Sequence, residues 1–463
     1  MNTTFEKIDA VYASQKQAFA TGRTLPIAFR KQQLDALCRA IKKWEPRIYE
    51  ALWNDLRKSY EEAYLTETSI VLAEIRNAHK KVGRWAKREH VMPNLSVLPS
   101  RSYVVKEPLG TTLIVSPWNY PVQLLLSPLV GAISAGCTAI LKPSPYVPTV
   151  SQTIADMIGE TFSEDYIAVV QGHRDVNAHL LEKHFDLIFY TGSPAVAHTV
   201  MEAAAKHLTP VVLELGGKSP CIIDRTADIE VAAKRVAWGK SLNSGQTCIA
   251  PDYILIHRDV KDQFVEAFKR QLLVLHGQDV KESPHYVRMV SEKAYRRVCS
   301  YLKQGHVICG GRTDDGQRFI EPTLMDEVDQ EAPVMNEEIF GPIFPMVAFD
   351  DDGESTFADK VVEYVANRPK PLAFYYYGDE KTGWRIIRRT SSGGACINDD
   401  IMHIVNTHMP FGGVGNSGMG SYHRKLSFEA FTHRRAVLVT PKHFDLPIRY
   451  MPYKFFKYIK HIV

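Results

Sequence analysis

The chain has 463 residues, of which 45% are hydrophobic and 23% are charged, a composition typical of globular proteins. At roughly 150 residues per domain, this length predicts two or three domains. The formal net charge is only +4, which argues against nucleic acid as a partner.

The seven cysteines are scattered along the chain and include no CxxC pair. This pattern favours a reducing compartment over a disulfide framework and argues against a zinc site, so we expect no metal. The N-terminal residues lack the apolar core of a signal peptide, and no stretch has the ~18 apolar residues needed to span a bilayer. We therefore expect a cytoplasmic protein.

Residues 5–90 are predicted to be helical because apolar residues recur at helical spacing in two segments. These residues are Ile27, Leu34, Leu37, Cys38 and Ile41, then Leu65, Leu72, Ile75, Val82 and Trp85. The basic residues between positions 80 and 88 are expected on the solvent face. Loop-like sequence from residue 91 and a predicted strand at 101–108 indicate an excursion from the main body.

From residue 111 onward, short apolar strands alternate with helices. Strands are predicted at 111–115, 138–141, 167–170, 185–190 and 211–215, with helices at 121–135, 147–158, 176–182 and 194–207. A second segment continues with strands at 220–223 and 253–256, helices at 229–240 and 260–275, and a last strand at 436–440. This alternation predicts an α/β fold with parallel sheets, in which ligands bind beyond the carboxyl ends of the strands.

Cys248 follows a turn of small and polar residues, Ser-Leu-Asn-Ser-Gly-Gln-Thr, between a predicted helix and a predicted strand. Gly245 gives the backbone conformational freedom just before it. A cysteine in this position is either an exposed nucleophile or a buried structural thiol. The turn alone favours the structural interpretation.

Four other loops carry polar residues at or near predicted strand ends. Asn119 is a candidate donor to an oxyanion, and Lys142 is a candidate partner for a ribose or phosphate. Gly192 and Ser193 directly precede a predicted helix, and the N-terminus of a helix favours an anion. Glu214, before two glycines, is a candidate general base. Each also has an ordinary interpretation as a turn or surface residue, and the three-glycine dinucleotide fingerprint is absent.

Taken together and in order, these loops resemble the aldehyde dehydrogenase superfamily over nearly the whole chain. The matching motifs are Pro117-Trp118-Asn119, residues 213–218 (Leu-Glu-Leu-Gly-Gly-Lys), residues 245–248 (Gly-Gln-Thr-Cys) and residues 338–342 (Glu-Ile-Phe-Gly-Pro). The segments 248–253, 410–420 and 445–450 and the short N-terminus are similar to the class 3 branch, which acts on fatty and aromatic aldehydes.

The resemblance implies a role for each motif. Cys248 would be the nucleophile, Asn119 and the Cys248 backbone N–H would hold the oxyanion, and Glu214 would activate the water that releases the acid. Tyr120 would line the aldehyde tunnel. The residues implied for binding NAD or NADP are Ser116, Trp118, Lys142, Gly192, Ser193, Glu338 and Phe340.

Two positions depart from the family pattern. Pro145 stands where many NAD-preferring relatives carry a glutamate that repels the 2′-phosphate of NADP, so we expect NADP to be accepted alongside NAD. Ala197 stands where the family often has glycine, and we expect little effect because alanine suits a helix.

The family architecture implies a cofactor domain, a catalytic domain and a small β element for bridging and oligomerisation. The expected ranges are 1–90 and 109–213, 214–430, and 91–108 with 431–445, followed by a tail at 446–463. Pairing of the exposed strands across a two-fold axis would give a homodimer. The basic, aromatic tail is expected to dock on the body or a partner subunit, with membrane contact as the less favoured alternative.

Three other functions compete with this assignment. A CoA-acylating dehydrogenase is disfavoured because those relatives typically lack the glutamate found here at position 214. A cysteine hydrolase is disfavoured because nothing in the sequence places a histidine beside Cys248. A non-catalytic binding protein is disfavoured because all the motif residues are present.

Overall fold

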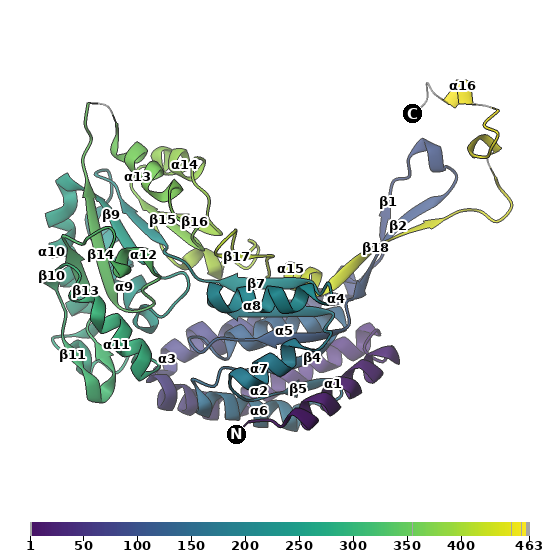
Figure 1. The fold of residues 1–463 in the computed structure, drawn as a ribbon, viewed down its shortest axis with the longest axis horizontal. Helices are drawn as coiled ribbons and strands as arrows, with labels where there is room; N and C mark the ends of the chain where they lie inside the picture. The colour runs from purple at the N-terminus through teal and green to yellow at the C-terminus, as the bar shows by residue number, and fades with distance from the viewer. Residues whose placement is uncertain (1, 354, 446, 455, 460–463) are drawn as a thin grey trace.

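The computed structural model describes residues 2–353, 355–445, 447–454 and 456–459. Two α/β units, each built on a mainly parallel sheet, lie side by side, and a long antiparallel arm extends from one of them (Figure 1). The predicted α/β fold class is therefore confirmed.

The N-terminal region is helical, as predicted. It contains α1 (Phe5–Ala20), α2 (Ile27–Leu56), α3 (Tyr60–Ala63), a π-helical turn η1 (Tyr64–Thr68) and α4 (Ser69–Trp85). The apolar residues predicted for α4 are buried, but Leu65 is 65% exposed, so its assignment to the same face was wrong. The π turn interrupts the 3.6-residue period, and apolar spacing therefore cannot be carried from α3 into α4.

The first sheet has the strand order β17-β7-β6-β3-β4-β5. Its strands are β3 (Thr111–Val115), β4 (Thr138–Lys142), β5 (Ile167–Val169), β6 (Leu187–Gly192), β7 (Val211–Leu215) and the antiparallel edge strand β17 (Gly418–Met419). After β3 the chain adds β4 and β5 on one side, then crosses to add β6 and β7 on the other. The switch point between β3 and β6 is where a doubly wound sheet binds its ligand.

Helices cover both faces of this sheet. They are α5 (Gln123–Ala135), α6 (Pro148–Thr161), α7 (Arg174–Leu181) and α8 (Pro194–Ala205), together with the N-terminal helices. Ile114 and Phe189 share a core with α2, α4, α5 and α6, whereas Leu113 and Ile188 share a core with α1, α7 and α8. Adjacent strand residues thus point to opposite faces, which explains the continuous apolar runs in the sequence.

The second sheet has the order β10-β13-β14-β9-β8-β15-β16 and is parallel except for β10. Its strands are β8 (Pro220–Ile223), β9 (Tyr253–His257), β10 (His306–Cys309), β13 (Thr323–Asp326), β14 (Ile343–Phe349), β15 (Ala373–Tyr377) and β16 (Gly394–Ile397), and a separate hairpin joins β11 (Thr313–Asp314) to β12 (Phe319–Ile320). Its helices are α9 (Ile229–Ser241), α10 (Lys261–His276), α11 (Glu292–Tyr301), α12 (Pro333–Asn336), α13 (Phe357–Ala366) and α14 (Glu380–Ile387).

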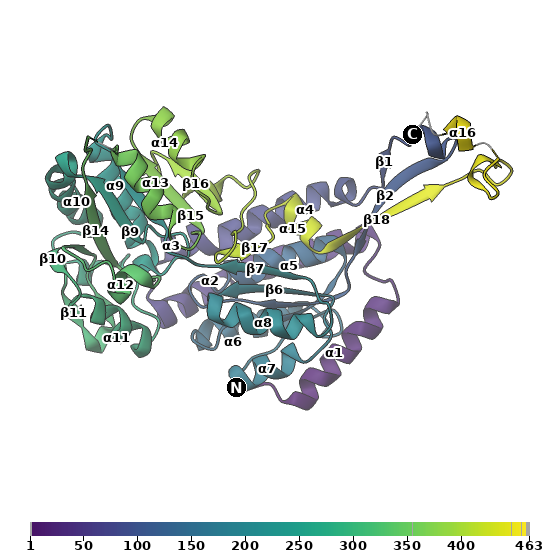
Figure 2. The ribbon, with the colours of Figure 1, turned by 45° about the horizontal axis from the view of Figure 1, so that its top comes forward.

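The arm consists of β1 (Glu89–Val91), β2 (Arg101–Pro108) and β18 (Thr432–Val439), and it projects away from both sheets (Figure 2). The last strand was predicted at 436–440 but begins at Thr432. Its first four residues, Thr-His-Arg-Arg, are polar and therefore carry no hydropathy signal for a strand. The segment before it returns to the first unit, where β17 joins the sheet and α15 (Lys425–Ala430) packs on α5. The domain limits given above stay a prediction.

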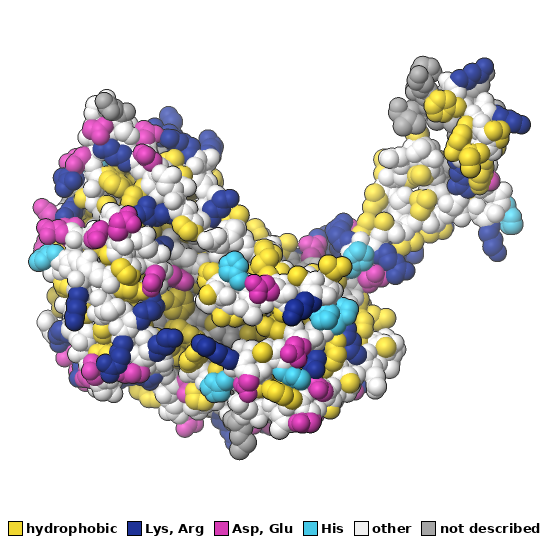
Figure 3. All heavy atoms as spheres, in the orientation of Figure 1, with side chains coloured by type: hydrophobic (Ala, Val, Ile, Leu, Met, Phe, Trp, Pro, Cys, Tyr) yellow, Lys and Arg dark blue, Asp and Glu magenta, His cyan; other side chains and the backbone are white. Residues whose placement is uncertain are grey.

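The described part of the tail contains a short turn η8 (Pro447–Arg449) and α16 (Phe456–Ile459). It lies near the tip of the arm, away from the two sheets, where apolar and basic side chains gather on the surface (Figure 3). Tyr450, Met451, Tyr453 and Phe456 are all exposed. The expectation that the tail docks on the body of its own subunit is therefore not met for these residues. In the described ranges, no helix is both long enough and apolar enough to cross a membrane.

Candidate active site

The turn that carries Cys248 is an unusual backbone conformation. The 3-10 turn η3 (Leu242–Gly245) follows α9 directly, and Asn243, Ser244 and Gly245 all have positive φ, at 51°, 53° and 69°. A side chain at Gly245 would also collide with the carbonyl oxygen of Gly341, so only glycine fits there. The three left-handed residues reverse the chain and bring Cys248 to the junction between the two units.

Buried amides hold this turn in place. The Gln246 side chain donates to the carbonyl oxygens of Asn243 (3.0 Å) and Arg288 (3.1 Å) and accepts from the Val290 N–H (3.0 Å). The Asn243 side chain donates to the carbonyl oxygens of Gln246 (3.0 Å) and Asn119 (3.1 Å). The turn is thus fixed by buried hydrogen bonds. One of them, from the Asn243 side chain to the Asn119 carbonyl oxygen, connects the turn to the loop after β3.

That loop carries the predicted Asn119 and Tyr120. The Asn119 side chain is 2% exposed and donates one N–H to the Gln246 carbonyl oxygen at 3.0 Å. An amide group has two N–H donors, so the second is available to a ligand. Its Oδ1 has no partner within the described chain. The Tyr120 hydroxyl bonds the Thr247 hydroxyl at 2.7 Å, so both residues are tied to the turn before Cys248.

Glu214 lies in β7, where the antiparallel partner Gly418 covers it from the sheet edge. Its side chain is 3% exposed, and neither carboxyl oxygen has a partner among the residues that the structure describes. Burial without a partner raises the pKa of Glu214 well above its usual value. A carboxylate whose pKa is raised is a stronger base than an ordinary carboxylate, which suits a general base.

The Cys248 thiol is half-buried, and its pKa is raised by burial and then by the neighbouring carboxyl groups of Glu338 and Glu214. Two carboxyl groups, one from each α/β unit, therefore raise the pKa of the same thiol. The sequence predicted all three residues separately, and the fold brings them together.

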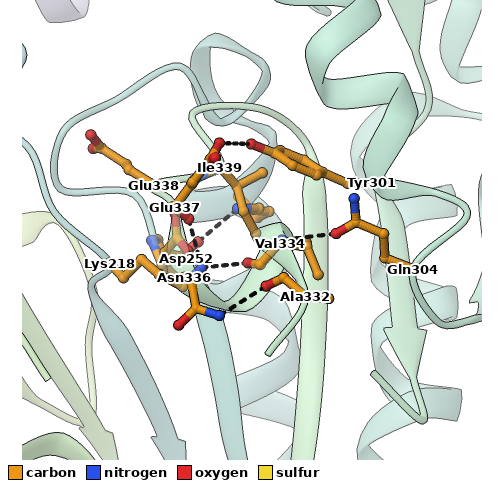
Figure 4. A network of polar contacts seen from close by, with 12 residues as sticks. Lys218, Asp252, Tyr301, Gln304, Ala332, Val334, Asn336, Glu337, Glu338 and Ile339 are labelled. Atoms are coloured by element: carbon orange, nitrogen blue, oxygen red, sulfur yellow. Dashed lines mark hydrogen bonds and ion pairs between the residues drawn. The ribbon is translucent and has the colours of Figure 1, made fainter. Parts of the chain in front are cut away.

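Glu338 follows α12 on a loop that is held by a network around Asp252 (Figure 4). Lys218 forms an ion pair with Asp252 and donates to the carbonyl oxygens of Val334 (2.7 Å) and Glu337 (3.1 Å). Asp252 accepts from the Ile339 N–H at 2.9 Å. Asp252 was not predicted as a site residue, although it lies in the motif segment 248–253, directly before β9.

The Glu338 carboxyl group itself points away from this network. It lies against Gly216, where any side chain would collide with it, and it accepts from the Gly217 N–H. Burial and the nearby Asp252 raise the pKa of Glu338 to about 8. Gly216 thus leaves space for the Glu338 carboxyl group, and Gly217 donates its N–H to it, although Glu338 belongs to a motif more than a hundred residues later in the chain.

Two predicted aromatic residues from different units also meet. The rings of Trp118 and Phe340 lie edge to face, with centroids 5.3 Å apart. Phe340 has a positive φ of 47°, which is uncommon for an aromatic residue and turns the ring toward this contact.

The remaining predicted cofactor residues lie around the switch point. Lys142 ends β4 and is 1% exposed, so the alternative of a surface lysine is wrong. Its ammonium group donates to the Pro143 carbonyl oxygen at 2.9 Å, and burial lowers its pKa to about 8. Gly192 ends β6, and Ser193 is the N-cap of α8 but makes no capping hydrogen bond with its side chain.

Several buried polar atoms at this edge lack partners in the described part of the chain. They are Ser116 Oγ, Asn119 Oδ1, Thr191 Oγ1 and both carboxyl oxygens of Glu214. Since buried polar groups are nearly always paired in folded proteins, this group of unpaired atoms fits a polar ligand such as a dinucleotide. The described residues contain no cluster of three or more His, Cys, Asp or Glu side chains that could hold a metal ion.

Fold and site together define an α/β enzyme in which a sheet edge suited to a dinucleotide faces a half-buried cysteine. The model of the aldehyde dehydrogenase family matches residues 1–437, and the chain belongs to that family. It is an NAD(P)-dependent aldehyde dehydrogenase of the class 3-like branch.

Curated relatives match almost the full chain. A 4,4'-diaponeurosporen-aldehyde dehydrogenase of Staphylococcus aureus is 45% identical over 457 residues, which cover 98% of each chain. A dimeric, NADP-preferring aldehyde dehydrogenase of Canis lupus familiaris is 42% identical over 449 residues, covering 96% of this chain and 98% of the relative. Among solved structures, a substrate-bound Staphylococcus aureus AldH superposes with a TM-score of 0.95 at 44% identity and covers 100% of both chains.

Proposed function

We propose that this enzyme oxidises its aldehyde to the carboxylic acid through a thioester on Cys248. The observation that carries the proposal is the position of the Cys248 thiol. Cys248 lies two residues after Gln246, whose carbonyl oxygen holds the Asn119 amide, and the nearby Glu214 carboxyl group contributes to the raised pKa of the thiol. A nucleophile, an oxyanion donor and a base are the groups that acyl transfer requires.

The reaction begins when the Cys248 thiolate attacks the aldehyde carbon and forms a C–S bond. The free N–H of Asn119 and the backbone N–H of Cys248 donate to the negative oxygen of the thiohemiacetal. As the carbonyl re-forms, hydrogen leaves the carbon with its electron pair, and Cys248 retains a thioester. A nicotinamide held at this edge would supply the hydride acceptor.

Hydrolysis of the thioester then completes the cycle. Glu214 takes a proton from water as the water oxygen attacks the thioester carbon. The C–S bond breaks, the acid leaves, and Cys248 is released as a thiolate. In this scheme Glu214 must be ionised before it can act, and Cys248 must be ionised before it can attack.

The same edge of the first sheet is proposed to hold NAD or NADP. Lys142 would bind the adenosine ribose, Gly192 and Ser193 would face the pyrophosphate, and Glu338 would bind the nicotinamide ribose. Phe340, Trp118 and Ser116 would line the cleft. The unpaired Ser116 hydroxyl and the Trp118–Phe340 contact support this assignment.

The raised pKa values predict a direction for the pH dependence. Both Cys248 and Glu214 react in the deprotonated form, and burial raises the pKa of both groups, so the fraction of each reacting form increases as the pH rises. We expect kcat and kcat/KM to rise with pH, by up to about tenfold per pH unit while the reacting form is the minority. Steady-state rates across the pH range measure this, and rates that fall as the pH rises would contradict it.

We also propose that NADP is accepted alongside NAD, because Pro145 offers no carboxylate to repel a 2′-phosphate. Kinetics with both cofactors test this, and a preference for NAD of about a thousandfold, or about 4 kcal/mol, would exclude it. Pro145→Glu is expected to lower kcat/KM for NADP by at least about tenfold through charge repulsion, with little change for NAD. The neutral variant Pro145→Gln is the matched control and is expected to keep NADP activity.

The proposed substrates are medium- or long-chain aliphatic or aromatic aldehydes. The names of the relatives support this class, since one acts on a 4,4'-diaponeurosporen-aldehyde. Tyr120, which is buried beside Asn119, is proposed to line the aldehyde tunnel. A series of kcat/KM values over aldehydes of increasing length, with benzaldehyde, tests the class, and a maximum at acetaldehyde would contradict it.

A homodimer is proposed from the arm. Within the described chain, β18 pairs only with β2, which leaves its other edge open along eight residues. Leu438 and Val439 near its end are exposed. An open edge of this length is a liability unless a partner covers it. Size-exclusion chromatography with light scattering is expected to give twice the chain mass, and a monomer would exclude the pairing.

A further inference from the structure

A buried ion pair lies behind the loop that carries Asn119. Lys58 follows α2, which Arg57 ends in a left-handed conformation (φ 57°, ψ 33°) so that the next side chain turns inward. The Lys58 ammonium lies 2.8 Å from a carboxyl oxygen of Glu67, and both side chains are 0% exposed. Removing two charges from water is costly, and an apolar pair of the same volume is often as stable, so stability alone does not account for them.

Their other side-chain hydrogen bonds go to one short segment, residues 119–123. The Lys58 ammonium also donates to the Asn119 carbonyl oxygen at 3.0 Å and lies 4.2 Å from the centroid of the Tyr120 ring. The second oxygen of Glu67 accepts from the N–H groups of Val122 (3.0 Å) and Gln123 (2.9 Å) at the start of α5. The pair therefore holds the loop at both of its ends, and two of the three N–H donors of the ammonium are used in these hydrogen bonds, while its charge lies over the Tyr120 ring.

The Asn119 peptide is held from the opposite side by the cysteine turn. Its carbonyl oxygen accepts from the Asn243 side chain at 3.1 Å, and the Asn243 N–H donates to Glu62 at 3.0 Å. Glu62 lies in α3, close in sequence to both members of the pair. The segment from residue 58 to residue 67 thus contacts both parts of the oxyanion site, the loop with Asn119 and the turn before Cys248.

The π-helical turn explains how Glu67 reaches this position. Residues 64–68 depart from the α-helical period, so the Glu67 side chain is rotated relative to a regular continuation of α3. It then points to the first turn of α5, whose N–H groups have no partners within the helix. Single π turns of this kind occur often at functional sites.

We propose that Lys58 and Glu67 are positioning residues, which set the Asn119 amide at the oxyanion. The proposal rests on the proposed function of Asn119. Small displacements of a group that contacts the reacting atoms can cost about a hundredfold in rate. Lys58→Met keeps the length of the side chain but removes the charge and the hydrogen bond to the Asn119 carbonyl. It is expected to lower kcat by about a hundredfold, with less than about a twofold change in KM for the cofactor.

The decisive readout is which step becomes slow. If Asn119 is displaced, formation of the thioester slows, so the pre-steady-state burst of reduced cofactor disappears in Lys58→Met. Arg30→Met is the matched control, because Arg30 is also a buried cation that donates to two backbone carbonyl oxygens, those of Thr24 and Ser134 at 3.1 Å, but it lies away from the site. It is expected to lower the melting temperature and to leave kcat unchanged.

A double-mutant cycle with Asn119→Ala separates positioning from general destabilisation. If Lys58 acts through Asn119, adding Lys58→Met to Asn119→Ala costs less than about threefold, whereas independent effects would multiply. Glu67→Gln keeps the shape of the side chain, and it provides a second test of the positioning role if Lys58→Met does not fold. It is expected to lower kcat by about tenfold, again with loss of the burst and without additivity.

The outcomes discriminate between the two claims. Effects that multiply, or a burst that persists in both Lys58→Met and Glu67→Gln, would overturn the positioning role while leaving the proposed reaction intact. Normal turnover in Asn119→Ala would instead overturn the oxyanion role on which it rests.

Discussion

Replacement of Cys248 by alanine is expected to abolish aldehyde oxidation, with a loss in kcat of at least about 10⁴-fold. Without the thiol no covalent intermediate can form, so hydride would have to leave from an aldehyde hydrate that is not covalently bound to the protein. The residues proposed to bind the adenosine and the pyrophosphate lie in other loops, so cofactor binding is expected to change by less than about twofold. Steady-state assays and a fluorescence titration with reduced cofactor measure the two quantities.

The matched control is Cys309→Ala. Cys309 is also half-buried, and burial raises its pKa as well, but it lies on β10 at the far edge of the second sheet. Its replacement is expected to leave kcat unchanged. Turnover near the wild-type rate in Cys248→Ala would remove the covalent mechanism from the account.

Glu214→Gln is expected to separate the two halves of the reaction. Glutamine keeps the size of the buried side chain but cannot accept a proton from water, so deacylation slows by about 10²- to 10⁴-fold. Thioester formation does not use this group, so a burst of reduced cofactor close to one equivalent per site is expected to persist before the slow phase. Stopped-flow absorbance at the wavelength of the reduced nicotinamide measures both phases.

Glu74→Gln provides the control for this variant. Glu74 is also a buried carboxyl group with a raised pKa and one oxygen that has no hydrogen-bond partner in the described chain, but its other oxygen binds the Arg424 N–H. Its replacement is expected to leave both phases unchanged. If the burst vanished in Glu214→Gln while the slow rate were retained, the role of the carboxyl group would lie in acylation.

Much of the fold was accessible from the sequence because parallel strands that are buried on both faces are short, apolar and regularly spaced. The strands that begin at Thr111, Thr138, Val211, Pro220 and Tyr253 were predicted at the residues where they start. The prediction of strands and helix faces failed where apolar spacing does not mark the element. The first half of β18 is polar, and the π turn shifts Leu65 out of the apolar stripe.

The candidate site shows a similar division. Cys248, Asn119 and Glu214 could be singled out because each lies in a short motif and the motifs together, in their order along the chain, resemble the family. Lys58 and Glu67 could not, since each looks like an ordinary charged residue at the end of a helix. Only the irregular turn between them, which no periodicity predicts, makes them a buried pair. Lys142 was ambiguous for the same reason, because sequence alone does not show that its strand end is covered.

The most direct test of the account is to trap the intermediate on Cys248. Glu214→Gln is mixed with NAD and an aldehyde, quenched in acid during the slow phase and digested, and the peptides are weighed by mass spectrometry. We predict an acyl group, with the mass of the aldehyde less one hydride, on the peptide that contains Cys248. An unmodified Cys248 peptide after a full burst, or an acyl group on another cysteine, would contradict the central claim.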